Sequence, residues 1–195
     1  GHMTDFSKTK QLFELPEGII YLDGNSLGPL PKAARDRVTK TISDEWGQML
    51  ITGWNYAGWM SQPAKLGDQI GRLIGAEAGQ TVLGDTLSIK VYQALASALE
   101  MRPDRRVILS DSGNFPTDLY MAEGLIRSLD KGHQLVTPSP EEVEAHINSD
   151  LAVLMLTEVD YRTGRRHDMK RLTKLAQEAG ALVIWDLAHS AGALP

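Results

Sequence analysis

The stretch Ala181-Leu-Val-Ile-Trp-Asp186-Leu-Ala-His189-Ser-Ala-Gly192 decides the predicted fold. Its apolar, partly β-branched run predicts a buried strand that an aspartate closes. In an open parallel α/β sheet, ligands bind at the carboxyl ends of the strands. Asp186 therefore either faces a ligand, where it could pair with a cationic ring nitrogen or a metal, or caps a following helix. This stretch alone leaves both interpretations open.

The composition narrows the class of protein. A hydrophobic content of 42% over 195 residues predicts a globular core, and the net charge of −5 argues against a nucleic-acid partner. No apolar run reaches the roughly 18 residues of a membrane span, so we expect no membrane partner. The absence of cysteine excludes disulfides and thiolate chemistry and fits a cytoplasmic enzyme. Residues 1–3, Gly-His-Met, resemble the remnant of an expression tag.

Apolar runs of strand type alternate with segments of helical periodicity along the chain. Strands are expected at residues 19–22, 81–83, 107–109, 134–137, 151–156 and 181–185, and helices at 31–46, 63–74, 89–99, 119–129, 140–147 and 168–179. Residues 51–60 hold three aromatic side chains and predict a loop, either a packed lid or a wall for an aromatic ligand. This alternation predicts an α/β fold with a mostly parallel sheet flanked by helices.

Polar and aromatic residues recur just after the predicted strands. They are Thr86, Ser88, Phe115, Asp118, Thr157, Asp186 and His189. A helix start rich in hydroxyls can hold phosphate, an aromatic face can stack on a heterocycle, and a carboxylate can keep its nitrogen protonated. Together these groups describe a pocket for pyridoxal phosphate.

Each residue of this set also has a structural interpretation. Phe115 could belong to the core, Asp118 could cap a helix, and His189 could be a hydrogen-bonded core histidine. A nicotinamide site is disfavoured because no G-x-G-x-x-G links a strand to a helix. The spacing of histidines and carboxylates predicts no metal site.

Four segments carry a resemblance to a known family. Tyr21-Leu-Asp-Gly-Asn-Ser-Leu-Gly28, Asn114-Phe-Pro-Thr-Asp118, Tyr161-Arg-Thr-Gly164 and Trp185-Asp-Leu-Ala-His-Ser-Ala-Gly192 resemble kynureninases, especially the bacterial type. The resemblance implies a cytoplasmic homodimer of the fold-type-I, class V aminotransferase-like group of pyridoxal-phosphate enzymes. Such an enzyme hydrolyses L-kynurenine to anthranilate and L-alanine in tryptophan catabolism, a pathway linked to NAD biosynthesis.

The resemblance also implies roles for individual residues. Asp186 would be the catalytic partner of the pyridinium nitrogen, Phe115 would stack on the ring, and Trp54 and Asn25 would contact substrate. Trp54 favours kynurenine over 3-hydroxykynurenine. The cofactor-binding set is Thr86, Leu87, Ser88, Phe115, Pro116, Thr117, Asp118, Thr157, Asp186 and His189.

The sequence departs from the family because no lysine matches the one that forms the Schiff base, and the arginine that binds the substrate carboxylate in the family is absent as well. We therefore expect residues 4–50 to be an N-terminal segment with a substrate-side loop and helix, and residues 51–195 to be the first part of the large domain. The rest of that domain and a small C-terminal domain would be missing. The alternatives are a cysteine desulfurase or an aminotransferase, which usually carry histidine at the position of Phe115, or an inactive fragment that serves as an interaction module.

Overall fold

A computed structural model describes residues 3–195, so Gly1 and His2 of the predicted tag remnant lie outside the described residues. The chain divides into two compact units. Unit 1 runs through Arg72 and includes residues 76–82, whereas unit 2 comprises residues 73–75 and 83–195. The predicted boundary near residue 50 stays a prediction. None of the helices in the described part of the chain is long and apolar enough to cross a membrane.

Unit 1 is built from short helices and a small hairpin of two strands. The strands β1 (Phe13–Glu14) and β2 (Leu30–Pro31) pair in antiparallel fashion. The helical segments are α1 (Ser7–Lys10), α2 (Lys32–Lys40), the π-helix η1 (Thr41–Trp46), α3 (Gly47–Met49), η2 (Leu50–Thr52), α4 (Gly53–Tyr56), η3 (Trp59–Ser61) and α5 (Gln62–Ile74), whose last two residues belong to unit 2.

Two predictions for unit 1 are wrong in detail. Residues 19–22 form no strand, because Ile20 and Leu22 stand 87% and 90% exposed and no ladder partner lies beside them among the described residues. The aromatic stretch 51–60 is helical rather than an open loop. Its short turns bring the Trp59 ring so close to Gly53 that a Cβ there would lie 2.6 Å from the indole. The predicted helices at 31–46 and 63–74 are confirmed, the first with a π-helical second half.

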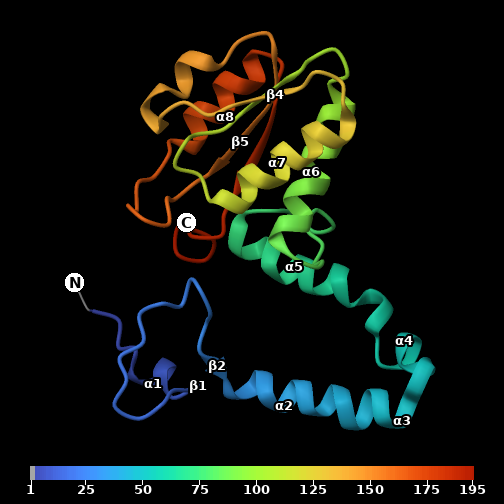
Figure 1. Ribbon diagram of the computed structural model, residues 1–195. Helices are drawn as coiled ribbons and strands as arrows, with labels where there is room; N and C mark the ends of the chain where they lie inside the picture. The colour runs from blue at the N-terminus through green and yellow to red at the C-terminus, as the bar shows by residue number, and fades with distance from the viewer. Residues whose placement is uncertain (1–2) are drawn as a thin grey trace. The chain divides into compact units, whose positions relative to one another are not determined.

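Unit 2 contains a four-stranded, fully parallel sheet in the order β4-β3-β5-β6. Figure 1 shows this sheet lying between helices. Its strands are β3 (Val107–Leu109), β4 (Gln134–Val136), β5 (Leu151–Thr157) and β6 (Leu182–Asp186). Its helices are α6 (Leu87–Met101), α7 (Pro116–Leu129) and α8 (Met169–Glu178), with the 3-10 turns η4 (Pro140–Glu142) and η5 (Glu144–His146). The predicted α/β class with a parallel sheet flanked by helices is confirmed.

Helices cover both faces of this sheet, and the alternation along β5 shows how. Val153 and Met155 point into a cluster with α6 and α7, whereas Leu154 and Leu156 pack with α8 and Val143 on the opposite face. All seven residues of β5 are buried, as expected for a central parallel strand. Burying these apolar side chains is the main force that holds the unit together.

Three predictions for residues 81–195 need correction. Residues 81–83 form no strand, and residues 140–147 form two 3-10 turns instead of one helix. The run 182–186 is a strand, but its apolar residues are only half-buried because β6 lies at the edge of this sheet. Apolar composition alone cannot tell an edge strand from a central one.

The strand order places a topological switch point between β3 and β5. From β3 the chain moves to β4 on one side, and it then returns past β3 to add β5 and β6 on the other. In open α/β sheets, the connections leave in opposite directions at such a point and open a crevice at the carboxyl ends of the strands. The fold therefore predicts a ligand site beside the loops that follow β3, β5 and β6.

Candidate functional site

A chain of hydrogen bonds joins the carboxyl ends of β3, β5 and β6. Asn114 follows β3, and Thr157 and Asp186 are paired residues at the ends of β5 and β6. The Thr157 hydroxyl lies 2.6 Å from Asn114 Oδ1 and 3.4 Å from Asp186 Oδ2. The amide of Asn114 donates to Ser110 Oγ at 3.0 Å, which fixes its oxygen toward Thr157. All four side chains are buried, so this polar network is rigid.

Asp118, in the first turn of α7, adds a second carboxyl group to this site. Its side chain is 1% exposed, and its Oδ2 atom has no hydrogen-bond partner among the described residues. Burial, together with the neighbouring Asp186 carboxylate, raises the pKa of Asp118 to about 8. The neutral, protonated form of Asp118 is therefore favoured at neutral pH.

The structure decides between the interpretations that the sequence left open for these acids. No helix follows Asp186 within the described residues; its Oδ1 accepts a hydrogen bond from the backbone N–H of Ala188 at 2.8 Å. Asp118 is not the N-cap of α7, a position held by Phe115 without a side-chain bond. Phe115 is 40% exposed and so is not a core residue. Neither of these two acidic side chains caps a helix.

The predicted phosphate-holding residues lie at the start of α6. Thr86 is the N-cap, and its Oγ1 accepts from the backbone N–H of Ile89 at 3.3 Å. Leu87 is exposed and Ser88 is half-buried. Helices in a parallel α/β unit run against the strands, so this helix start lies toward the end of the unit where the strands finish (Figure 1). Exposed amides at the positive end of a 15-residue helix can bind an anion.

The remaining cofactor-binding predictions fall in the loops beside the acids. Pro116 and Thr117 open α7. His189, in the turn after β6, is half-buried, and its ring centroid lies 6.2 Å from that of Tyr161. A cavity of about 250 Å³ lies in this region, lined by Thr157, Phe115 and Tyr161 among others. The structure thus brings together the residues predicted after β3, β5 and β6.

Sequence reasoning missed a buried pair next to this cavity. Asp111 Oδ2 lies 2.7 Å from His167 Nε2, and both side chains are 6% exposed. The pair joins the loop after β3, which carries Phe115, to the segment before α8. The only signal in the sequence was the position of Asp111 just after a predicted strand. His133 is also buried, and burial lowers its pKa.

Unit 1 carries the two predicted substrate residues. Asn25 is exposed in the turn that precedes β2. Trp54, on α4, is 46% exposed and packs edge to face against Trp59 with ring centroids 6.0 Å apart. The indole N–H of Trp59 donates to the buried Glu45 at 2.9 Å. Trp54 therefore offers an accessible aromatic surface on a fixed support.

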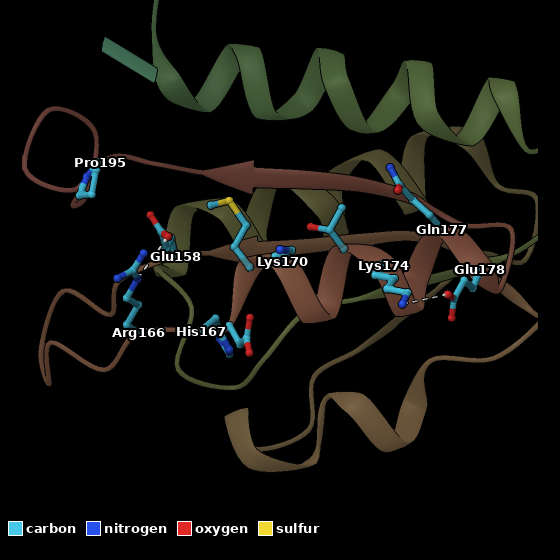
Figure 2. A pocket seen from close by; sticks show the side chains of 11 residues that line it. Glu158, Arg166, His167, Lys170, Lys174, Gln177, Glu178 and Pro195 are labelled. Carbon is cyan, nitrogen blue, oxygen red and sulfur yellow. Dashed lines mark ion pairs between the residues drawn. The ribbon is translucent and has the colours of Figure 1, made fainter. Parts of the chain in front are cut away.

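A larger hollow of about 1050 Å³ lies along α8, and Figure 2 shows the side chains that line it. Two ion pairs line it, Arg166 with Glu158 at 3.5 Å and Lys174 with Glu178 at 3.9 Å. We place the candidate site at the smaller cavity instead, because Thr157, which lines it, is hydrogen-bonded to the buried Asp186. Among residues 3–195, no group of three potential metal ligands gathers in one place.

The fold and the site together define a class of protein. This is an open α/β domain, covered on both faces, with a buried carboxylate pair at its topological switch point. Residues 64–194 match the DegT/DnrJ/EryC1/StrS aminotransferase family, and the chain belongs to that family.

The chain is similar to bacterial kynureninases over nearly its whole length. It is 52% identical to the kynureninase of Pseudomonas fluorescens and 48% identical to that of Burkholderia pseudomallei, in each case over 95% of this chain. It spans 46% of the length of each of these relatives. The resemblance predicted from the four motifs is confirmed.

Solved structures share the fold at low sequence identity. The cysteine desulfurase of Thermococcus onnurineus superimposes with a TM-score of 0.75 at 19% identity, over 98% of this chain and 49% of that one. The cysteine desulfurase CsdA of Escherichia coli gives 0.72 at 18% identity, over 97% and 50%. Because the identities are this low, these similarities establish the architecture alone.

Proposed function

We propose that the strand-end site binds pyridoxal 5'-phosphate. The observation that carries this is the buried pair of Asp118 and Asp186 at the strand ends, where Oδ2 of Asp118 has no hydrogen-bond partner among the described residues. A protonated ring nitrogen would supply a hydrogen-bond donor to this pair and a positive charge that compensates the buried Asp186 carboxylate. The exposed face of Phe115 and the N-terminus of α6 fit the ring and the phosphate of the same molecule.

Each residue of the site would then have a distinct task. When bound, the cofactor supplies an electron sink for the pair left at a substrate carbon. Asp186 would hold the proton on the ring nitrogen, and Asp118 would share that charge in a dry environment. Thr157, fixed by Asn114, would keep Asp186 in place. Thr86, Leu87 and Ser88 would hold the phosphate, with Pro116, Thr117 and His189 around the ring.

We further propose that the full-length protein hydrolyses L-kynurenine. Support comes from the 52% and 48% identity to proteins named kynureninase and from the accessible Trp54 surface. The reaction consumes one water, whose hydroxyl ends on the acyl carbon as anthranilate, while a proton ends on the β-carbon of L-alanine. Trp54 would face the aromatic ring of the substrate, and Asn25 would bind a polar group. The same proposal includes a homodimer in the cytoplasm, a role in tryptophan catabolism and a link to NAD biosynthesis.

The test combines a substrate assay with a variant of the key acid. We expect the full-length protein with added pyridoxal phosphate to release fluorescent anthranilate from L-kynurenine, and to use 3-hydroxykynurenine less well. Asp186→Asn should lower turnover by about 100-fold or more, because the neutral amide cannot stabilise a protonated ring nitrogen. Near wild-type turnover in this variant would refute the assignment of Asp186. Alanine release from cysteine, without anthranilate from kynurenine, would indicate a desulfurase instead.

A further inference from the structure

Tyr161, in the loop between β5 and α8, is an aromatic residue that the proposed function leaves without a task. Its ring centroid lies 5.2 Å from that of Phe115, with the two planes at 83°. The His189 ring lies 6.2 Å away and tilted by 32°, and the Arg162 guanidinium lies over the Tyr161 ring at 5.3 Å. Tyr161 is therefore held among three neighbours, two of which belong to the predicted cofactor set.

The backbone around Tyr161 is closed by its own hydrogen bonds. Asp160 Oδ1 accepts from the backbone N–H groups of Arg162 and Thr163, both at 2.8 Å. The N–H of Gly164 donates to the Asp160 carbonyl at 3.0 Å, and Gly164 adopts the left-handed φ of +70° that this turn requires. The backbone of Tyr161 is thus held in a defined turn, and its ring is positioned by its contacts with Phe115, His189 and Arg162.

A hydrogen bond fixes the backbone of Phe115, but it does not by itself fix the orientation of the ring. Its N–H donates to Asn114 Oδ1 at 2.7 Å, and Pro116 follows it at the start of α7. Phe115 is 40% exposed, so its ring needs a side-chain neighbour to hold one orientation. The perpendicular contact with Tyr161 supplies that neighbour, because edge-to-face pairs have a preferred geometry.

We propose that Tyr161 is a positioning residue that holds the ring of Phe115 at the angle needed to stack on a bound planar heterocycle. Tyr161 and Phe115 line the same cavity of about 250 Å³, together with Thr157. The inference rests on the proposed cofactor site, because it gives Phe115 a ligand to stack on. No hydrogen bond within the described residues engages the Tyr161 hydroxyl, so the aromatic ring carries the role.

The experiment measures how the full-length protein binds pyridoxal phosphate, by titration and by the visible circular dichroism induced in the bound cofactor. We expect Tyr161→Leu to weaken binding about two- to tenfold, the range of an aromatic pair, and to change the induced signal. Tyr161→Phe should match the wild type in both, because it keeps the ring. Tyr120→Leu, at a 63% exposed position on α7, is the matched control and should change neither.

A double variant tests whether Tyr161 acts through Phe115. In a Phe115→Leu background, the added Tyr161→Leu change should have no further effect on affinity or on the induced signal. Full additivity of the two changes would overturn the proposal, and so would a wild-type signal in Tyr161→Leu. If Tyr161→Leu does not fold by far-UV circular dichroism, Tyr161→Met replaces it, with the same expected shift and the same overturning result.

The outcome for the wild type separates this inference from the proposed function. Wild-type protein that binds no pyridoxal phosphate would refute both. Wild-type protein that binds the cofactor and forms anthranilate, with Tyr161→Leu indistinguishable from it, would refute the role of Tyr161 alone.

Discussion

Asp118 and Asp186 are two acidic residues that lie buried side by side. Their burial should make the free energy of unfolding depend on pH. In the folded chain the pKa of Asp118 is raised to about 8 by burial and then by Asp186, against an ordinary value of 3.8. Between these values the folded state holds a proton that the unfolded state releases. The contribution of Asp118 to the free energy of unfolding should therefore be most favourable at low pH and should fall as pH rises toward about 8.

Replacing Asp118 with asparagine should remove this dependence. The amide mimics the protonated acid, so Asp118→Asn should be more stable than the wild type near pH 8 and similar near pH 4. One proton per molecule corresponds to a slope of at most about 1.4 kcal/mol per pH unit. Urea unfolding of both proteins from pH 4.5 to 9, without cofactor, measures the difference. Parallel curves for the two proteins would contradict a raised pKa at this site.

At the residue scale, the sequence predicted which side chains lie at the ends of strands. It did not predict which of these side chains form hydrogen bonds with one another. Thr157 and Asp186 were placed correctly because each closes a recognisable apolar run. The bond from Thr157 to Asn114 spans 43 residues and that from His167 to Asp111 spans 56, so both depend on strand order and helix packing. Local patterns carry no such information, and the residues around His167 in the sequence are polar.

The π-helix η1 is the feature of unit 1 that local patterns least anticipate. Its extra residue per turn places Glu45 on the buried side at 4% exposure, although both neighbours along the chain are exposed. Glu45 accepts from Arg37 at 2.6 Å and from the Trp59 indole at 2.9 Å, and Trp59 supports Trp54. The Arg37 hydrogen bond, followed by that of Trp59, lowers the pKa of Glu45.

Glu45→Leu should loosen this support, because it leaves a guanidinium and an indole N–H without their acceptor. We expect a lower Tm and a smaller near-UV circular dichroism signal from the Trp54–Trp59 pair. Because the folded pKa of Glu45 is lowered, the difference from wild type should be present above about pH 4.5 and shrink as pH falls below it. Asp44→Asn, at the exposed neighbouring position, is the control. An equal effect of both substitutions would refute a role for the buried acceptor.

At the element scale, strands and helices with a full apolar face were predictable and short pieces were not. β3, β5, α6 and α8 have the correct type because their periodicity is long or their burial is complete. Residues 19–22 and 81–83 resemble strands in composition but have no partner strand, and a ladder requires two. Whether a partner exists is decided by the rest of the chain.

At the scale of the whole of unit 2, alternation along the chain predicted a parallel sheet but not the order β4-β3-β5-β6. That order creates the switch point and so determines which loops meet. The two ends of the sheet therefore differ in role. The candidate ligand site lies at the end where the strands finish, beside Thr157. At the opposite end, where the strands begin, arginine side chains join neighbouring segments.

Arg105 lies at the end of the sheet where β5 begins, and replacing it tests whether the two ends of the sheet act independently. Its guanidinium donates to the carbonyls of Leu151 at 3.0 Å and Ala179 at 2.7 Å, and so ties the segment before β3 to the start of β5 and the end of α8. Arg105→Leu leaves two carbonyls without a charged donor, so we expect a loss of about 1.5–3 kcal/mol in the free energy of unfolding. Arg127→Leu, at an exposed position near the end of α7, should cost less than about 0.5 kcal/mol.

Urea unfolding measures both variants, and pyridoxal phosphate titration of the folded proteins should give wild-type affinity for each. Weaker cofactor binding by folded Arg105→Leu would show that the two ends of the sheet are coupled, contrary to a site defined by the loops after β3, β5 and β6.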